Sequence, residues 1–311
     1  MDTDRSKAIS RRIEKRLGFP SLTEKLTDDI SSSDLSSLLT EVFASRAEHT
    51  APHELLKQYA QNQYAKPACC DAVQYRLLEA DMLLAAQNAG VRSVILSPAA
   101  LLGCCSVFGA VSQNKVISAT RNLEMVSDAT NMLALHIAAG IKAGAMSHAN
   151  GPIHLCATHR HVRYQPAFAD GMLPHFGIFT MVSAGRSQSS YAFEIESMLL
   201  QLRFYRDYWL RRHGTKLTLS VNPRAGYKDA EGFITRIVSA VRDNLPDMEL
   251  SIDNEVNNTA YYKGLQATLN AKAGDSIIEI GDIGFTDWTR RLLNSPGERL
   301  LISAMALDRQ M

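Results

Sequence analysis

The order of strand-like and helix-like segments after residue 71 limits what this chain can fold into. Apolar runs of strand length occur at 94–96, 153–162, 176–183, 217–221, 249–252, 276–280 and 299–305. Helix-length segments separate most of them, but 153–162 and 176–183 are joined only by a loop, Tyr164 to Pro174. Elements that are mixed rather than strictly alternating favour an α+β fold over a doubly wound one. We therefore expect a mostly antiparallel sheet flanked by helices.

Two regions of different composition divide the chain. Residues 1–33 are polar and charged, and Asp34 to Tyr64 shows helical spacing that Pro52 interrupts. Residues 72–311 carry the strand-like runs and the longest expected helix, Tyr191 to Arg212. With 46% hydrophobic residues in 311, the chain can bury a sizeable core. We expect a helical N-terminal arm at 1–71 and one core domain at 72–311.

Charge and cysteine content exclude several classes of protein. Lys and Arg number 33 against 32 Asp and Glu, without the basic excess that is usual in proteins that bind nucleic acid. The five cysteines include two adjacent pairs and no C-x-x-C, which suits neither a disulfide framework nor that zinc motif. The N-terminus lacks an apolar signal segment, and no run of about 18 apolar residues occurs. We expect a cytoplasmic protein that binds neither nucleic acid nor membrane.

The strand-like run at 153–162 carries the first functional candidates. Alternate side chains of a strand share a face, so His159, His161 and Arg163 project together beside the Tyr164–Pro174 loop. An arginine held in this way presents a rigid fork of donors to a phosphate or carboxylate. Arg163 is therefore a candidate anion ligand, although on its own it is more simply a structural arginine.

Three other segments carry polar or aromatic residues at the ends of expected elements. Glu298 to Arg309 reads as a buried strand that turns into a helix start, where Arg309 emerges. Tyr261 and Tyr262 precede Gly264 at an expected strand edge. Asp128, with Ser127 as a rival, is placed to cap the helix expected at about 127–140.

In order and spacing, these segments resemble the motifs of the class II aminoacyl-tRNA synthetase catalytic core. The run 153–179 looks like motif 2 and its loop, and 298–309 is similar to motif 3. The Tyr-Tyr-x-Gly segment and the long helix resemble histidyl-tRNA synthetase and its paralogue, the regulatory subunit of ATP phosphoribosyltransferase. Residues 126–130 stand where that family has its amino-acid loop, and 74–102 resembles the dimer-forming motif 1. The resemblance covers about residues 72–311.

The resemblance implies roles for particular residues. Arg163, Gln165 and Arg309 would bind a nucleotide, with Arg163 on the α-phosphate and Arg309 on the γ-phosphate. An amino-acid-like ligand would contact Asp128 and Thr130 through its ammonium, and His175, Tyr261 and Tyr262 around its side chain. ATP and Mg²⁺ are the implied cofactors, and a small molecule and a second copy of the chain are the implied partners.

Several positions depart from the family pattern. Gln165 replaces the motif 2 glutamate, Leu173 the aromatic that stacks on adenine, and Asn257 an arginine. The alanines Ala304 and Ala306 replace motif 3 glycines, and His175 and Phe179 replace the residues that read an imidazole. The sequence ends shortly after Arg309, where a synthetase would continue into an anticodon-binding domain. Aminoacylation of tRNA is therefore not expected.

Two interpretations concern metals. His159 and His161 could supply two zinc ligands on one strand face, but the sequence does not identify a third, and we assign no metal site. The acidic residues Asp253, Glu255, Glu279 and Asp282 could gather near a nucleotide and its Mg²⁺, although a solvated strand edge is the simpler explanation.

Two functions of different class remain. The lost catalytic contacts favour a binding or regulatory protein that keeps an amino-acid-like pocket and takes an amino-acid-like ligand, an adenine nucleotide or both. The pair Arg163 and Arg309 favours an ATP-dependent enzyme that activates a carboxylate as an adenylate for an acceptor other than tRNA. The sequence leaves open whether the protein is an enzyme.

Overall fold

The structure is a computed structural model that describes residues 2–164, 173–253, 261–273 and 276–311. Three residues of the sequence analysis, Gln165, Glu255 and Asn257, lie outside these ranges. The chain divides into two compact units. The arm unit contains residues 1–65 and 118–123, and the core unit contains residues 66–117 and 124–311.

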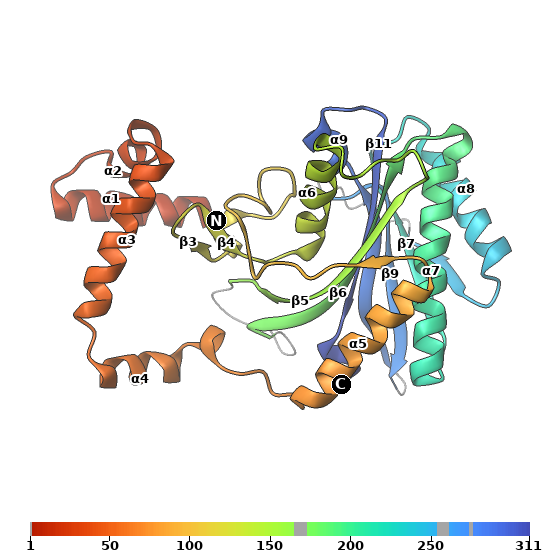
Figure 1. The fold of residues 1–311 in the computed structure, drawn as a ribbon, viewed down its shortest axis with the longest axis horizontal. Helices are drawn as coiled ribbons and strands as arrows, with labels where there is room; N and C mark the ends of the chain where they lie inside the picture. The colour runs from red at the N-terminus through yellow and green to blue at the C-terminus, as the bar shows by residue number, and fades with distance from the viewer. Residues whose placement is uncertain (1, 165–172, 254–260, 274–275) are drawn as a thin grey trace. The chain divides into compact units, whose positions relative to one another are not determined.

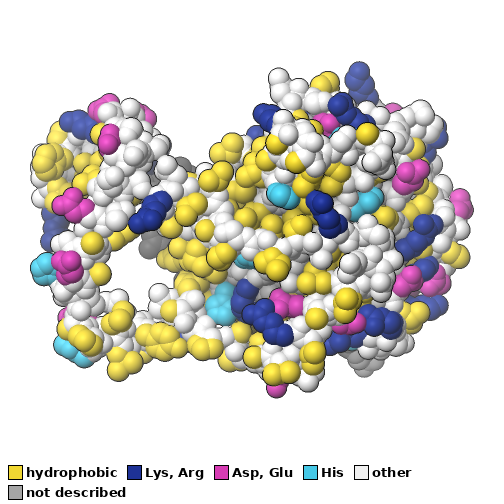
Figure 2. All heavy atoms as spheres, viewed as in Figure 1, with side chains coloured by type: hydrophobic (Ala, Val, Ile, Leu, Met, Phe, Trp, Pro, Cys, Tyr) yellow, Lys and Arg dark blue, Asp and Glu magenta, His cyan; other side chains and the backbone are white. Residues whose placement is uncertain are grey.

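The arm unit is helical. Its elements are α1 (Asp2–Leu17), α2 (Leu22–Glu24), a π-helical turn (Lys25–Asp29), α3 (Ser32–Glu48), α4 (Pro52–Gln61), a 3₁₀ turn (Gln63–Ala65) and the short strand β3 (Ser118–Ala119). The predicted break at Pro52 is confirmed, because α4 begins with this proline as its first residue. None of the side chains described in residues 6–65 is buried, and Figure 2 shows hydrophobic side chains on the surface of these helices.

The core unit is built on an eight-stranded sheet with the order β1-β5-β6-β11-β10-β9-β7-β8. The strands are β1 (Arg92–Ser93), β5 (Ile153–Val162), β6 (His175–Arg186), β7 (Leu217–Pro223), β8 (Glu249–Ile252), β9 (Lys263–Ala273), β10 (Ser276–Thr286) and β11 (Glu298–Ala306). The inner pairs are antiparallel, and the edge pairs β1–β5 and β7–β8 are parallel. The α+β prediction is confirmed, with a sheet that is mixed rather than wholly antiparallel.

Helices cover both faces of this sheet (Figure 1). On one face, α5 (Ala72–Asn88), α7 (Ala192–His213) and α8 (Ala230–Asn244) bury a large apolar core with strand residues such as Phe179 and Leu219. On the other face, α6 (Ala129–Lys142) and α9 (Trp288–Leu293) pack on residues that include Val182 and Ile302. Neighbouring strand residues such as Met181 and Val182 enter different cores because side chains alternate across a strand.

The remaining elements of the core unit are short. Strand β2 (Ala99–Leu101) pairs with β4 (Leu123–Met125), which continues into the loop before α6. Turns of 3₁₀ helix lie at Gln113–Lys115, Ser189–Tyr191 and Asp308–Gln310.

Within the eight-stranded sheet, the structure differs most from the sequence prediction at β1, β9 and β10. The prediction of a strand at 94–96 is wrong, because β1 ends at Ser93 and Ile95 is fully exposed. Strand β9 was not expected, because its outward positions are polar and its buried ones include the small Ala267 and Ala271. Strand β10 runs six residues beyond the expected end at Ile280, because both its neighbours, β9 and β11, pair with it along that stretch.

We expect Gly177→Ala to destabilise the core unit. Gly177 faces α5, and a Cβ at this position would meet the hydroxyl and ring of the buried Tyr75. Overpacking of this kind lowers the free energy of unfolding by about 1–3 kcal/mol, measurable by urea denaturation. Adding Tyr75→Phe removes the clashing oxygen and should restore part of the loss. A neutral Gly177→Ala would show that Tyr75 does not pack on β6 in this way.

Candidate ligand-binding site

A cavity of about 670 Å³ lies on the sheet face that α6 and α9 cover only in part. Strands β5, β6, β9, β10 and β11, the N-terminus of α6 and the C-terminal turn all contribute to it. Its lining includes Asp128, Thr130, His161, Arg163, Phe176, Ile178, Tyr261, Tyr262, Gln266, Glu279, Asp282, Ala304, Ala306, Asp308 and Arg309. The volume lies within the usual range for small-molecule sites.

Arg163 follows the last residue of β5 and lies at the wall of the cavity. Its Nε donates to the carbonyl oxygen of Ser127 at 3.0 Å, and its guanidinium lies over the ring of Phe176, 5.5 Å from the centroid. These contacts orient the guanidinium plane, which is the requirement for bidentate recognition of a carboxylate or phosphate.

Asp128 connects the start of α6 to Tyr261. One carboxylate oxygen accepts from the backbone nitrogen (2.9 Å) and hydroxyl (2.6 Å) of Thr130, and the other accepts from the Tyr261 hydroxyl at 2.5 Å. Asp128 is thus the N-cap of α6, as predicted, while its rival Ser127 pairs with the Cys105 thiol instead. Burial and the neighbouring Asp128 hold the pKa of Tyr261 well above its ordinary value, so Tyr261 stays a donor.

Asp282, on β10, forms a second carboxylate–tyrosine pair. Its Oδ2 accepts from the Tyr262 hydroxyl at 2.7 Å and from the Gln266 amide at 3.5 Å. Gln266 in turn accepts from the guanidinium of Arg224 at 2.7 Å. Burial raises the pKa of the Asp282 carboxyl to about 6, although the bond from Tyr262 opposes this shift. The carboxyl is therefore mostly ionised at neutral pH.

Gly264 is the residue that brings the tyrosine pair into the site. Its φ of 72° belongs to the left-handed region, which favours glycine. A Cβ here would lie 2.5 Å from the Tyr227 ring and 2.7 Å from the Phe233 ring. The turn needs this glycine for both reasons, and it places Tyr261 and Tyr262 before β9, with ring centroids 4.7 Å apart.

His161 is a neutral imidazole in the wall of the cavity. Its Nε2 accepts from the backbone nitrogen of Ala129 at 3.1 Å, so the ring proton is on Nδ1. Burial, reinforced by Arg163 and His159, places the pKa of His161 well below its ordinary value. The imidazole helps to cap α6 without adding positive charge next to Arg163.

Arg309 lines the cavity from the C-terminal 3₁₀ turn. Its guanidinium donates to the carbonyl oxygen of Glu279 on β10. The preceding Asp308 accepts from the backbone nitrogen of Gly177 and from Arg160, the latter at 3.3 Å, which ties the turn to β5 and β6.

The structure brings together six of the eight predicted site residues. Asp128, Thr130, Arg163, Tyr261, Tyr262 and Arg309 all line the one cavity. Gln165 lies outside the described residues. The contact of these residues with a ligand stays a prediction.

His175 is the predicted site residue that the structure does not bring into the cavity. It lies on the face of β6 that packs toward α5, as does the fully buried Phe179. The His175 ring accepts from Arg160 Nε at 2.7 Å and donates to the carbonyl oxygen of Lys66 at 2.6 Å. Strand alternation explains the difference, because Phe176 and Ile178 occupy the positions of β6 that face the cavity.

His159 and His161, the two possible zinc ligands, both lie on β5. In the described part of the chain, no three His, Cys, Asp or Glu side chains are grouped to hold a metal ion. His159 and His161 do share a face, as predicted, with ring centroids 5.6 Å apart. The Nε2 atoms of both are engaged by backbone groups, His159 as a donor to Ser97 at 3.2 Å.

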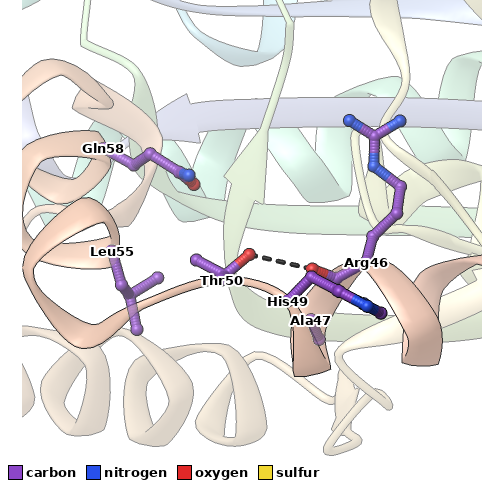
Figure 3. A pocket seen from close by; sticks show the side chains of 6 residues that line it. All are labelled: Arg46, Ala47, His49, Thr50, Leu55 and Gln58. Carbon is purple, nitrogen blue, oxygen red and sulfur yellow. Dashed lines mark hydrogen bonds between the residues drawn. The ribbon is translucent and has the colours of Figure 1, made fainter.

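A second hollow lies in the arm unit between α3 and α4 (Figure 3). It is lined by Arg46, Ala47, His49, Thr50, Leu55 and Gln58. The Thr50 hydroxyl donates to the Arg46 carbonyl oxygen at 2.9 Å, which closes the end of α3. Five of the six lining residues are exposed and Thr50 is half-buried, so this hollow is open surface rather than an enclosed site.

Sequence reasoning missed the part that Gln266 and His161 play in the cavity, and it identified Asp282 only as acidic charge at a strand edge. Gln266 belongs to the unrecognised strand β9, and Asp282 follows the expected end of β10. The alternation of Leu265, Ala267 and Leu269 with polar residues is the signal that could have revealed β9.

Asp282→Asn is expected to stabilise the protein at high pH. The raised pKa means that the folded state binds the proton more tightly than the unfolded state, whose carboxyl has a pKa near 3.8. The contribution of Asp282 to stability is therefore greatest below about pH 4 and declines as pH rises toward about 6. Above pH 7 the variant should gain about 1–3 kcal/mol in free energy of unfolding.

Urea denaturation between pH 4 and pH 8 measures this gain. Asp207→Asn is the matched control, because Asp207 is an exposed aspartate on α7. A constant difference between Asp282→Asn and wild type across this range would contradict a half-buried carboxylate that titrates near pH 6.

Comparisons with known proteins give a structural likeness and no sequence match. No protein-family model matches the chain, and neither does any curated protein. The structure is similar to that of apo histidyl-tRNA synthetase of S. aureus, with a TM-score of 0.58 at 14% identity over 77% of this chain and 65% of that one. A putative threonyl-tRNA synthetase of Aeropyrum pernix gives 0.61 at 13% identity, over 76% of this chain and 58% of that one.

A third similar structure is an ATP phosphoribosyltransferase regulatory subunit/histidyl-tRNA synthetase from Bacillus halodurans. It gives a TM-score of 0.57 at 11% identity, over 79% of this chain and 83% of that one. The chain spans less than two thirds of the staphylococcal and Aeropyrum proteins. At these identities the likeness concerns the fold: this chain has the fold of the class II aminoacyl-tRNA synthetase catalytic core.

Proposed function

We propose that the cavity binds a small amino-acid-like ligand and that the protein acts by binding or regulation rather than by charging tRNA. The observation that supports this is the convergence of Asp128, Thr130, Arg163, Tyr261 and Tyr262 on one cavity. These residues come from three distant parts of the chain, and together they offer an anion and a cation to a zwitterion.

The chemistry of the two charged groups suits the two ends of an amino acid. An ammonium group next to Asp128 would be held by a buried carboxylate that Thr130 and Tyr261 already orient. A carboxylate would pair with Arg163, whose guanidinium is held by Ser127 and Phe176. Charge-assisted bonds of this kind are the strong ones in a desolvated site.

The part of the cavity expected to bind ATP lacks several residues that the family uses for this purpose. Methyl groups of Ala304 and Ala306 line the floor where the family has glycines, and Leu173 lines the position of the adenine-stacking aromatic. These substitutions reduce space and stacking surface for ATP, which favours a binding protein over an adenylating enzyme. The similar Bacillus halodurans structure is that of an ATP phosphoribosyltransferase regulatory subunit/histidyl-tRNA synthetase, which supports the proposal of a regulatory role.

The alternative is an ATP-dependent enzyme that adenylates a carboxylate and passes it to an acceptor other than tRNA. The presence of Arg163 and Arg309 at walls of the same cavity favours it, because two arginines can clamp a triphosphate. Glu279 and Asp282 would then lie near the Mg²⁺ that accompanies ATP.

We also propose that the protein is a homodimer. Residues 74–102, which resemble the family's dimer-forming motif, expose large apolar side chains: Leu77, Leu84, Ile95, Leu101 and Leu102 are each between 47% and fully exposed. Figure 2 shows hydrophobic side chains at the surface in the part of the core unit that carries α5. Several exposed apolar residues in one segment are typical of a protein interface.

No helix in the described ranges is long and apolar enough to cross a bilayer. The cytoplasmic location of the protein stays a prediction.

Arg163→Ala is expected to weaken ligand binding while leaving the fold intact. Loss of a charge-assisted contact of about 1.5–3 kcal/mol corresponds to roughly tenfold to hundredfold weaker affinity. Calorimetry with a panel of amino acids and with ATP measures the affinity. Arg203→Ala is the control, because Arg203 is an exposed arginine that donates to Asn244.

Pyrophosphate exchange with the same panel separates the two functions. Amino-acid binding without exchange supports the binding protein, and label entering ATP supports the enzyme, in which case Arg163→Ala should abolish exchange. Equal affinity of Arg163→Ala and wild type would remove Arg163 from the site.

For the dimer, we expect Leu77→Arg to shift the protein to monomer, because a charge would be buried in the apolar interface. Light scattering after gel filtration gives the mass. Leu56→Arg adds the same single charge at an exposed leucine of α4 in the arm unit and is the control. A wild-type protein that elutes as a monomer at micromolar concentration would contradict the proposal.

A further inference from the structure

Asp282 is a feature of the cavity that the proposed amino-acid contacts leave unused. It lies on β10 and accepts from Tyr262, whereas the other cavity carboxylate, Asp128, accepts from Tyr261. The adjacent tyrosines thus hold one carboxylate each. A ligand that spans the cavity would meet both.

The surroundings of Asp282 hold the carboxylate in one orientation. Tyr262 and Gln266 both donate to Oδ2, and Arg224 holds Gln266 through its amide oxygen. Tyr262 is buried, and burial keeps its pKa well above the ordinary value, so it remains a donor. Because both bonds recorded for the carboxylate use Oδ2, Oδ1 is the oxygen left to a ligand in the described part of the cavity.

The charge at Asp282 is not balanced by a direct ion pair with any residue that the structure describes. The charged or titratable groups that act on it are Tyr262, Glu279, Asp128 and Arg163. Glu279 and Asp128 add negative charge, and Arg163 is the cation among them. A mostly ionised carboxylate in a desolvated wall gains most from a ligand that brings its own positive charge.

We infer that Asp282 receives a cationic group at the end of the ligand side chain, so that the ligand is an amino acid with a terminal primary amine. This inference rests on the proposed function, which assigns the α-ammonium to Asp128 and the α-carboxylate to Arg163. The two tyrosine-held carboxylates then match the two ammonium groups of one diamino acid.

A primary amine suits the acceptor that Asp282 offers. An ammonium needs acceptors, and Asp282 supplies one whose orientation Tyr262 sets. Ornithine and lysine are the simplest ligands of this class.

The test compares ligands of matched shape by calorimetry on the full chain. Lysine and norleucine have side-chain carbon chains of equal length, and only lysine carries a terminal amine. Glutamine supplies a neutral polar end. The wild type should prefer lysine or ornithine to norleucine by about tenfold or more, as expected for a buried charge-assisted contact. Asp282→Asn should abolish that preference, while Asp207→Asn, an exposed aspartate on α7, should keep it.

The pH dependence of binding gives a second readout. The carboxyl must lose its proton to pair with an ammonium, so affinity for lysine should fall as pH drops through about 6, where the pKa of Asp282 lies. Affinity for norleucine should change little over the same interval. Asp282→Asn should remove the difference between the two ligands.

The outcomes separate this inference from the proposed function. Binding of norleucine or glutamine as tightly as lysine would overturn the role of Asp282 and leave the amino-acid site in place. A preference for lysine that survives Asp282→Asn would also overturn it. If no amino acid binds, and Arg163→Ala changes nothing, both the function and the inference fail.

Discussion

The unequal cover on the two faces of the central sheet is the constraint on which the rest of the structure depends. Helices α5, α7 and α8 bury one face along its length, whereas α6 and α9 bury only part of the other. The uncovered part of that face becomes the cavity. Side chains alternate along β5, β6, β9, β10 and β11. Within each strand, one set of alternate residues therefore faces the core under α5, α7 and α8, and the other set faces α6, α9 and the cavity.

The N-terminus of α6 and the C-terminal turn complete the cavity by different means. Asp128 caps α6 and binds Tyr261, so the helix start and the segment before β9 are held together by one carboxylate. Asp308 anchors the turn that presents Arg309 by accepting from the backbone of Gly177 and from Arg160. The site is therefore positioned by hydrogen-bonded carboxylates on rigid elements, which suits the recognition of a small charged ligand.

Much of the fold followed from local patterns. The strand at Ile153–Val162, the long helix near 192–213 and the break at Pro52 all agree with apolar periodicity and proline chemistry. Six candidate residues line the same cavity, and the order of the motifs in the sequence was enough to predict them as a group. The prediction that His175 lines the cavity was wrong, because the register of β6 turns this side chain toward α5. That register is decided by strand pairing. Strand β9 was not predicted, because some of its buried positions are alanine.

The sequence by itself determined the class of fold, the helical character of the N-terminal region, and which charged residues are candidates for a ligand. These depend on local spacing, on capping and on the alternation of polar and apolar residues. Only the tertiary structure decided that Asp282 pairs with Tyr262 in a desolvated wall and that His161 is a neutral cap for Ala129. Desolvation depends on what packs around a group, and residues distant in the chain supply that packing.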